Sequence, residues 1–508
     1  MLTIDGRTLT LDDVDAFLQG RFSKVCVAAA AKKDIAKGRA AIEAILARGQ
    51  TVYGINTGFG KLASKAIDAA DLKTLQKNLL LSHAVGVGRP LEPAIARLAL
   101  LLRANALARG HSGVRPAVVE LLVEMLNRGV TPVIPEQGSV GASGDLAPLA
   151  HMALVLIGEG QATVDGQVLS GIDALARKGL APIELEAKEG LALINGTPIS
   201  AAIGAAAFVR ARRLATLADV ACGLTLEALQ GSIRPFDPRV AALRPHPGHA
   251  ETAQNVRLLM QGSEILESHR NCSKVQDQYS LRCAPQVHGA ARDALTHVGE
   301  VLARELNAVT DNPLIFPDDG DVVSAGNFHA EPLAMIFDYA AIAVAELANI
   351  SERRLENLVN PDLSGLPPFL VESSGLNSGY MIPQVTAAAL VSENKSLAHP
   401  ASVDSIPTSA NKEDHVSMAP IAARQFAAVV ENSTWVLAIE MLAAHQALTF
   451  NPTLKAGRGI EAARRTIAAK VPKLVHDRAL RKDMDAVRAL IDDGDLLAAV
   501  RREVPGLA

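Results

Sequence analysis

Hydrophobic residues recur at helical spacing along most of the chain. After Arg115 and Pro116, apolar residues fall at positions i, i+3, i+4, i+7 and i+8, and the run ends at Gly129. A proline in the first turn and a glycine just past the last turn are the usual limits of an amphipathic helix. Residues 95–106 repeat this period, which stops at Gly110. The pattern therefore predicts two consecutive helices that each bury one face.

Four longer stretches are rich in alanine, with small or apolar residues on several faces. A helix that is apolar nearly all round is buried on all sides, at the centre of a bundle or of an oligomer. We therefore expect a mainly α fold with a long central helical bundle. Residues 1–110 should form a smaller N-terminal α+β part, and residues 111–508 the helical core with the C-terminal helices. The alanine-rich stretches are residues 198–232, 284–308, 330–358 and 416–449.

Two short segments alternate apolar and polar residues around an Asp-Gly pair. They are Leu2–Leu9 and Ala162–Leu169, and each precedes a short stretch of helical period that ends at a glycine, Gly20 or Gly179. Asp-Gly between alternating segments favours a two-residue β-hairpin. We expect two small hairpins, each leading into a short helix, at the edges of an otherwise helical fold.

Composition narrows the class of protein further. The 508 residues include 49% apolar and 20% charged side chains, the net charge is −4, and only 3% are aromatic. A core so poor in aromatic residues fits close-packed helices better than sheets. A net charge near zero gives no electrostatic reason to bind nucleic acid or an anionic membrane. No uninterrupted apolar stretch approaches the roughly 18 residues of a membrane span.

The N-terminal residues and the cysteines indicate a reducing compartment. Met1 to Gly6 resemble neither a signal peptide nor a transit peptide. We expect a soluble cytoplasmic protein that binds neither nucleic acid nor membrane. The cysteines form neither a disulfide framework nor a CxxC pair, and they are Cys26, Cys222, Cys272 and Cys283.

Common nucleotide and metal motifs do not fit. A Walker loop aligned on Gly60 and Lys61 would have Ile55 in place of its first glycine, and no G-x-G-x-x-G follows a predicted strand. His246 and His249 could begin a metal site, but no third ligand is evident. We expect no dinucleotide cofactor and no metal.

The most unusual segment is Pro135–Leu149, where glycines recur every third residue directly before an apolar helix. One interpretation is a turn into a helix that Ser143 or Asp145 caps. A second is peptide cyclisation, in which the amide nitrogen of Gly144 attacks the carbonyl of Ala142 and two waters are lost, one of them from the Ser143 side chain. Glycine suits the attacking position because it lacks Cβ and tolerates a strained backbone. The spacing alone favours the cap, and both interpretations stay open.

Seven motifs follow one another in order along the chain: Tyr53–Gly60, Ser82–Gly88, Gly138–Pro148, Asn195–Pro198, Val275–Arg282, Asn327–His329 and Glu413–Met418. Together they resemble the family of histidine and aromatic amino-acid ammonia-lyases. The resemblance covers most of the chain, and seven motifs in order are far more specific than any one of them.

The resemblance implies an electrophilic prosthetic group, 4-methylideneimidazole-5-one (MIO), made from Ala142, Ser143 and Gly144 without an external cofactor. It also implies an aspartase/fumarase-like helical core. The oligomer implied is a homotetramer whose active sites combine loops from more than one subunit. In such an enzyme, residues 1–110 would contribute active-site loops and residues 111–508 the MIO triplet.

Three residues match catalytic positions of the family. Asn195 would hydrogen-bond the MIO group and stabilise negative charge on its oxygen. Tyr53 would be the general base, which requires neighbours that lower the reference phenol pKa of about 10. Tyr279 would assist catalysis or formation of the group from a closing loop. Without the resemblance, Asn195 is equally typical of a helix cap and Tyr53 of a half-buried loop tyrosine.

Three further residues match substrate-binding positions. Arg282 would bind the substrate carboxylate, because its planar guanidinium matches that group with two parallel hydrogen bonds. Gln276 would make a polar contact beside it, and Phe328 would pack against substrate or MIO. A surface ion pair for Arg282 and core packing for Phe328 are the alternatives.

The choice of substrate depends on His83 and Glu413. The pair Ser82-His83 is that of the histidine-specific members, whereas members acting on phenylalanine or tyrosine typically have Phe-Leu or His-Leu there. A carboxylate at Glu413, where phenylalanine enzymes commonly have Gln, can accept the N–H of an imidazole. A hydrophobic ring would leave both groups unpaired, which is costly when they are buried.

The resemblance therefore implies non-oxidative deamination of L-histidine to trans-urocanate and ammonia, a step of histidine degradation. Within the same class, a tyrosine or phenylalanine ammonia-lyase or aminomutase is the alternative. From another class, the chain could be a helical scaffold that kept these loops without the cyclised group.

Overall fold

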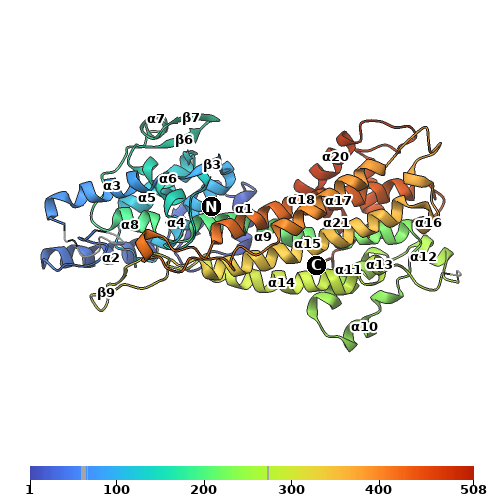
Figure 1. Cartoon of the computed structure of the whole chain (residues 1–508), viewed down its shortest axis with the longest axis horizontal. Coiled ribbons are helices and arrows are strands. Elements are labelled where there is room, and N and C mark those ends of the chain that lie inside the picture. Colours follow the sequence, from blue (N-terminus) through green and yellow to red (C-terminus); the bar gives the residue numbers. More distant parts are fainter. Residues whose placement is uncertain (59–64, 66, 272–273) are drawn as a thin grey trace. The chain divides into compact units, whose positions relative to one another are not determined.

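The computed structural model describes residues 1–58, 65, 67–271 and 274–508, and most of them are helical (Figure 1). The mainly α fold predicted from the sequence is confirmed. Gly60, Lys61 and Cys272, which entered the sequence interpretation, lie outside the described residues.

The chain divides into two compact units, each assembled from separate stretches of sequence. Unit 1 comprises Met1–Val209, Val298–Asp338 and Pro400–Arg424, and unit 2 comprises Arg210–His297, Tyr339–His399 and Gln425–Ala508. The predicted division into residues 1–110 and 111–508 stays a prediction. The sequence pattern could not indicate units such as these, because each is built from stretches that are far apart along the chain.

Four of the five boundaries between the units fall within long helices, and the fifth lies between His399 and Pro400, after α17. The four long helices confirm the four alanine-rich predictions. Two of them, α15 and α18, contain windows that are long and apolar enough to cross a membrane, but 67% and 72% of these windows is buried inside the chain. Such burial is typical of the core helices of a bundle. The four helices are α9 (Pro198–Ala228), α14 (Ala284–Glu305), α15 (Glu331–Val359) and α18 (Ala419–Leu448).

Unit 1 packs α3, α6 and α8 against one another and α4 against α5. The two helices predicted from the periodic pattern are confirmed as α4 and α5, and α5 ends at Gly129 with a left-handed φ of 73°. The helices that belong to this unit alone are α1 (Leu11–Leu18), α2 (Ala29–Ala47), α3 (Leu72–His83), α4 (Pro93–Leu107), α5 (Pro116–Arg128), α6 (Leu146–Leu156), α7 (Gly171–Arg177) and α8 (Glu189–Ile194), with the 3-10 turns η2 (Ala69–Asp71) and η5 (Ser409–Asn411).

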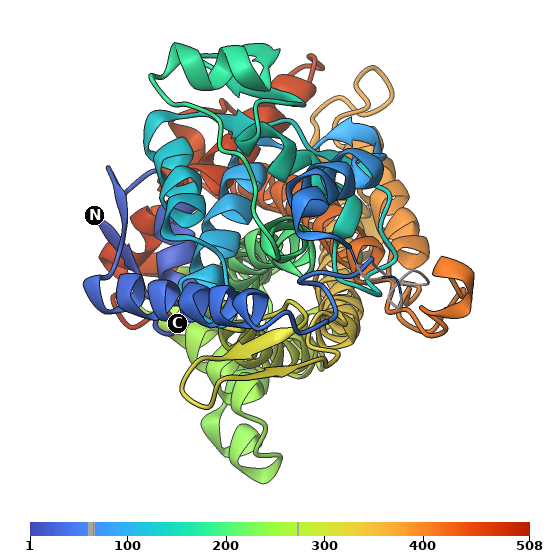
Figure 2. The same ribbon diagram turned by 90° about the vertical axis from the view of Figure 1, so that its left-hand side faces the viewer.

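Among the described residues, short strands border these helices in four small sheets of two or three strands each. The β8–β9 hairpin lies beside α2 (Figure 2). The pairs are β1 (Leu2–Ile4) with β2 (Val25–Val27), β3 (Val87–Pro90) with β5 (Pro135–Gln137), and β8 (Leu314–Phe316) with β9 (Asp321–Val323), and the three-stranded sheet is β4 (Thr131–Pro132), β6 (Gln161–Val164) and β7 (Gln167–Ser170).

One of the two predicted hairpins is confirmed and the other is wrong. Strands β6 and β7 are antiparallel, with Asp165 and Gly166 at φ 49° and 79° in the turn. Strand β1 instead pairs in parallel with β2. The carboxylate of Asp5 accepts hydrogen bonds from the N–H groups of Arg7 and Thr8. This turn directs the chain into α1 rather than into a returning strand.

Unit 2 is almost entirely helical. A buried ion pair joins α15 to α18 within this unit, because the Arg354 guanidinium donates to both carboxylate oxygens of Glu440, at 2.5 and 2.8 Å. The helices of unit 2 alone are α10 (Pro238–Leu243), α11 (Pro247–Leu259), α12 (Glu264–Ser268), α13 (Tyr279–Arg282), α16 (Pro361–Ser364), α17 (Met381–Leu397), α19 (Arg458–Ala468), α20 (Arg481–Asp492) and α21 (Asp495–Glu503), with the 3-10 turns η3 (Arg234–Phe236) and η4 (Pro368–Leu370).

Candidate active site

The glycine-rich segment forms the loop between β5 and α6, and its backbone requires glycine. Gly144 has a φ of +74°, and a Cβ at this position would lie 2.0 Å from the carbonyl oxygen of Gly196. A residue with a side chain would therefore be strained by its backbone and would also clash with the segment that joins α8 to α9.

Neither Ser143 nor Asp145 caps α6 with its side chain, so the helix-cap interpretation is wrong. Asp145 occupies the N-cap position of α6, but its side chain accepts no hydrogen bond from the N–H groups of the first turn of that helix. Its carboxylate accepts instead from the N–H groups of Ile199 and Ser200, at 2.7 and 3.0 Å, at the start of α9. Burial raises the pKa of Asp145 to about 6, against these hydrogen bonds and the charge of Arg103.

Both polar groups of Ser143 are bound by residues that the sequence had singled out. The Ser143 hydroxyl donates to Oε1 of Glu413 at 2.7 Å. The Ser143 carbonyl accepts from Nδ2 of Asn195 at 2.7 Å and from the N–H of Gly196 at 3.4 Å. Three segments far apart in sequence thus converge on one residue.

The position of Asn195 is fixed by α8, which ends at this residue. Arg103, fully buried in α4, donates through Nη1 to the carbonyl of Ala192 at 2.9 Å and through Nη2 to that of Asn195 at 3.0 Å. Burial lowers the pKa of Arg103 to about 10, while Asp311 and Asp145 oppose that shift. The sequence interpretation missed Arg103, whose only signal was a charged residue directly after the apolar run Leu98–Leu102.

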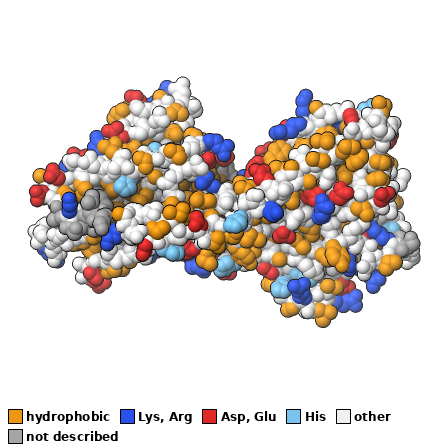
Figure 3. Space-filling model, viewed as in Figure 1, with side chains coloured by type: hydrophobic (Ala, Val, Ile, Leu, Met, Phe, Trp, Pro, Cys, Tyr) orange, Lys and Arg blue, Asp and Glu red, His pale blue; other side chains and the backbone are white. Residues whose placement is uncertain are grey.

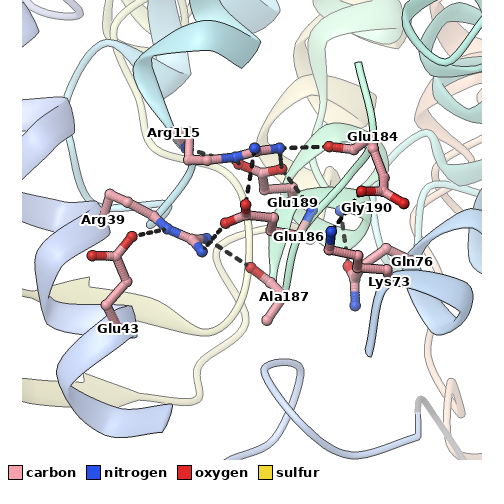
Figure 4. A network of polar contacts seen from close by, with 10 residues as sticks. All are labelled: Arg39, Glu43, Lys73, Gln76, Arg115, Glu184, Glu186, Ala187, Glu189 and Gly190. Carbon is pink, nitrogen blue, oxygen red and sulfur yellow. Dashed lines mark hydrogen bonds and ion pairs between the residues drawn. The ribbon is translucent and has the colours of Figure 1, made fainter. Parts of the chain in front are cut away.

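A network of ion pairs holds the other end of α8 (Figure 4). The Arg115 guanidinium donates to both Glu189 oxygens, at 2.8 and 2.7 Å, and to Glu186 at 3.0 Å. Arg39, which lies in α2, donates to the Glu186 carboxylate and to the carbonyl of Ala187. Because the Glu189 carboxylate is buried, these contacts satisfy charges that would otherwise be costly.

The contacts of Ser143 are compatible with the MIO group, as the atoms that would form its ring show. Closing the ring joins the nitrogen of Gly144 to the carbonyl carbon of Ala142, and the water losses remove the Ala142 oxygen and the Ser143 hydroxyl. The Ser143 carbonyl oxygen is then the oxygen of the ring, and Asn195 already donates to it. Ala142 is buried, so the ring would be enclosed on that side.

His83 and Glu413 lie close enough to interact electrostatically. Burial lowers the pKa of His83, and the charge of Glu413 acts in the opposite direction. His83 is the last residue of α3, and its Nδ1 is 3.0 Å from the Ser82 hydroxyl. The two residues predicted to select the substrate therefore lie near one another, and Glu413 contacts Ser143 directly.

Tyr53 and Phe328 are half-buried in unit 1. The loop of Tyr53 is held by its own side chains, since the Val52 N–H donates to Asn56 and the Gly54 N–H to Thr57. In the described part of the chain, no hydrogen bond joins the Tyr53 hydroxyl to Ser143. The roles of both residues stay predictions.

Tyr279, Arg282 and Gln276 belong to unit 2 and are not brought together with Ser143 by any described contact. The Tyr279 side chain is 71% exposed, and the Arg282 guanidinium stacks over its ring at 4.7 Å. Gln276 is exposed in the preceding loop. Tyr279 and Cys283 line a cavity of about 540 Å³ within unit 2.

His329 and His415, which belong to two of the motifs, also meet Glu331 at the start of α15, which the sequence did not reveal. Single ligand atoms of His329, Glu331 and His415 lie within 4.8 Å of one another. Both ring nitrogens of His329 already face backbone groups. Nε2 lies 3.2 Å from the carbonyl oxygen of His415, and Nδ1 accepts from the N–H of Glu331 at 3.4 Å. These contacts orient the ring and fix the segment after Phe328.

Comparison with known proteins identifies similar chains over the full length. The family described as aromatic amino acid lyase matches residues 9–469. A histidine ammonia-lyase of Anaeromyxobacter dehalogenans is 56% identical over 504 residues, which cover 97% of this chain and 99% of that protein. A crystal structure of histidine ammonia-lyase from Trypanosoma cruzi matches with a TM-score of 0.93 at 45% identity, covering 99% of this chain and 96% of the other. Tyrosine aminomutase from Streptomyces globisporus matches with a TM-score of 0.93 at 38% identity, covering 99% of each chain.

Proposed function

Because the chain belongs to the aromatic amino acid lyase family, we propose that it removes ammonia from L-histidine to give trans-urocanate. The MIO group formed from Ala142, Ser143 and Gly144 supplies an electrophilic alkene that activates the substrate for loss of a weakly acidic β-proton. No external cofactor or metal takes part in the proposal, and the cytoplasmic location expected from the sequence stays a prediction.

The observation that carries this proposal is the position of Glu413. Its Oε1 accepts the Ser143 hydroxyl, and that hydroxyl leaves as water when the group forms. Oε1 then becomes a free anionic acceptor directly beside the electrophile, where it can bind the N–H of a substrate imidazole. His83 adds a second polar contact, whereas a phenyl ring would leave both groups unpaired.

The remaining residues have roles that the family match supports. Asn195 and the Gly196 N–H donate to the Ser143 oxygen and stabilise negative charge that develops there. Tyr53 takes the β-proton as general base, and Phe328 packs beside the reacting centre.

The other part of the proposed site comes from unit 2 of a neighbouring subunit in a homotetramer. Arg282 binds the substrate carboxylate, Gln276 makes a polar contact and Tyr279 assists catalysis. The exposed ring of Tyr279, stacked on Arg282, suits residues that complete a site outside their own unit.

Exposed apolar side chains support the oligomer. In unit 2, the part of α15 after Asp338 exposes Tyr339 and Ile342, and α17 exposes Ile382 and Val385. Hydrophobic side chains are interspersed with both signs of charge on the face shown in Figure 3. An interface between subunits would require such groups to form a continuous apolar surface, and these four side chains are the candidates for it in unit 2. Sedimentation of the purified protein at several concentrations would test the tetramer.

A tyrosine-specific enzyme is the second candidate, because the TM-score of the aminomutase equals that of the histidine ammonia-lyase. The fold therefore does not distinguish the two activities, and His83 with Glu413 must do so. The purified protein should be offered histidine, tyrosine and phenylalanine separately, and ammonia and the conjugated product measured. Ammonia or a β-amino acid from tyrosine, with none from histidine, would overturn the proposal.

Intact mass tests the scaffold alternative. A protein lighter than its sequence by two waters has formed the group, whereas an unchanged mass together with inactivity towards all three amino acids would favour a scaffold.

A further inference from the structure

The second oxygen of Glu413 is held by a residue that has no assigned role. Oγ1 of Thr408 donates to Oε2 of Glu413 at 2.5 Å, while Oε1 faces Ser143. We propose that Thr408 is a positioning residue that aims the Glu413 carboxylate at the imidazole of the substrate. This inference rests on the proposed function and deepens it, because it explains how one oxygen is kept available for the substrate.

The backbone joins the same two residues. The N–H of Thr408 donates to the carbonyl of Glu413 at 2.9 Å, and the N–H of Glu413 faces the carbonyl of Thr408 at 3.4 Å. These bonds form an isolated antiparallel bridge. Side chain and backbone together hold Glu413 at the end of a closed loop of four residues between Thr408 and Glu413.

This loop adopts an unfavourable backbone conformation. Ser409, Ala410 and Asn411 have φ angles of 50°, 52° and 64°, in the left-handed region. Residues with a Cβ seldom adopt it, and three in succession persist only where surrounding contacts compensate. Strain of this kind concentrates at functional sites. In this loop, the compensating contacts are those that bring Thr408 to Glu413.

Loss of the Ser143 hydroxyl makes Thr408 more important. Before the MIO group forms, the Glu413 carboxylate has a side-chain donor on each oxygen. Afterwards, Thr408 is the donor that remains among those the structure describes. It occupies Oε2 and prevents the carboxylate from rotating, so that Oε1 stays directed at the substrate. A carboxylate without this donor would present its two oxygens in several orientations.

The test compares Thr408→Val, which keeps the shape but loses the hydroxyl, with Thr408→Ser, which keeps the hydroxyl. A hydrogen bond to a charged group corresponds to about 10- to 100-fold in binding. We expect Thr408→Val to raise both the KM for histidine and the inhibition constant of urocanate by about this factor, with a smaller change in kcat. Thr408→Ser should stay within about threefold of the wild type, because a hydroxyl donor remains.

Controls separate positioning from general support of the segment. Ser405→Ala removes another hydroxyl of the same segment, one that accepts from the Val416 N–H at 3.1 Å and has no described hydrogen bond to Glu413. It should leave the inhibition constant of urocanate near the wild-type value. In a Glu413→Ala background, Thr408→Val should change urocanate binding, measured by titration calorimetry, less than twofold, because no carboxylate is left to position.

The outcomes distinguish this inference from the proposed function. A wild type that turns over histidine, with Thr408→Val equal to it, overturns the inference alone. Equal losses in Thr408→Val and Thr408→Ser, or the same loss with and without the Glu413 carboxylate, also overturn it. A wild type that neither deaminates histidine nor binds urocanate overturns the proposed function and the inference with it.

Discussion

Replacing Arg103 by methionine should weaken both the fold of unit 1 and the reaction. The change removes the two hydrogen bonds that Arg103 donates to the carbonyls of Ala192 and Asn195, at 2.9 and 3.0 Å. Hydrogen bonds from a charged group contribute about 1.5–3 kcal/mol each. Methionine fills the space and avoids burying a charge, which offsets part of that loss. Because Asp145 and Asp311 lose a cationic neighbour, we expect a net destabilisation of about 3–5 kcal/mol.

The effect on turnover follows from the position of Asn195. Its backbone carbonyl would lose the Arg103 donor, so the amide that donates to Ser143 would no longer be held in place. A displacement of about 1 Å in a group of this kind costs about 100-fold in rate. We therefore expect kcat to fall by about 100-fold. Arg103→Lys is the matched control, because it keeps the charge but cannot reach both carbonyls with a planar fork.

Denaturant unfolding measured by circular dichroism gives the stability, at one protein concentration because an oligomer dissociates as it unfolds. Product absorbance gives kcat, and intact mass shows whether two waters were lost. Arg103→Met with wild-type stability and wild-type kcat would refute the argument that Arg103 anchors Asn195. Lower stability with unchanged kcat would show that Arg103 stabilises the fold without positioning the amide.

Three other changes have definite expected outcomes. Ser143→Ala should abolish turnover and the loss of two waters while the melting temperature stays near the wild-type value; residual activity near the wild type would contradict the proposed electrophile. Asn195→Ala should lower kcat by about 100- to 1,000-fold with a smaller change in KM, measured on protein whose mass shows the group. Burial lowers the pKa of His445 to about 4, so the neutral ring stabilises the fold fully above pH 6.5, and this contribution is lost as the pH falls towards 4. The loss approaches about 3 kcal/mol, and His445→Phe should flatten this part of a melting-temperature profile; an unchanged profile would contradict the assignment.

Local sequence determined most of the helices, because periodicity and end signals act within a few turns. Residues 116–128 form the predicted α5, and the four alanine-rich stretches form the four longest helices. The hairpin expected at residues 2–9 failed because β2 supplied a more distant partner and Asp5 turned the chain towards α1. Pairing between strands depends on such partners, which a short pattern does not contain.

The candidate site shows the same division. Sequence motifs identified Ser143, Asn195, His83 and Glu413 from residue types and their order. The convergence of Ser143, Asn195 and Glu413 within unit 1 depends on long-range hydrogen bonds between the end of α8, the loop before α6 and the segment before α18. No sequence pattern identified Thr408 as a partner of Glu413, because an ordinary threonine in a polar loop has no distinctive signal.

By itself, the sequence determined the helical class, and it contains the Ala142-Ser143-Gly144 triplet and the residue types on which the proposed histidine specificity rests. Only the tertiary structure decided that Asp145 caps α9 rather than α6, that Arg103 binds the backbone of Asn195, and that Glu413 ends a loop whose residues have left-handed φ angles. The physical reason is the separation along the chain of the residues that interact. Helix formation follows from neighbours along the chain, whereas a catalytic arrangement depends on hydrogen bonds between residues tens to hundreds of positions apart.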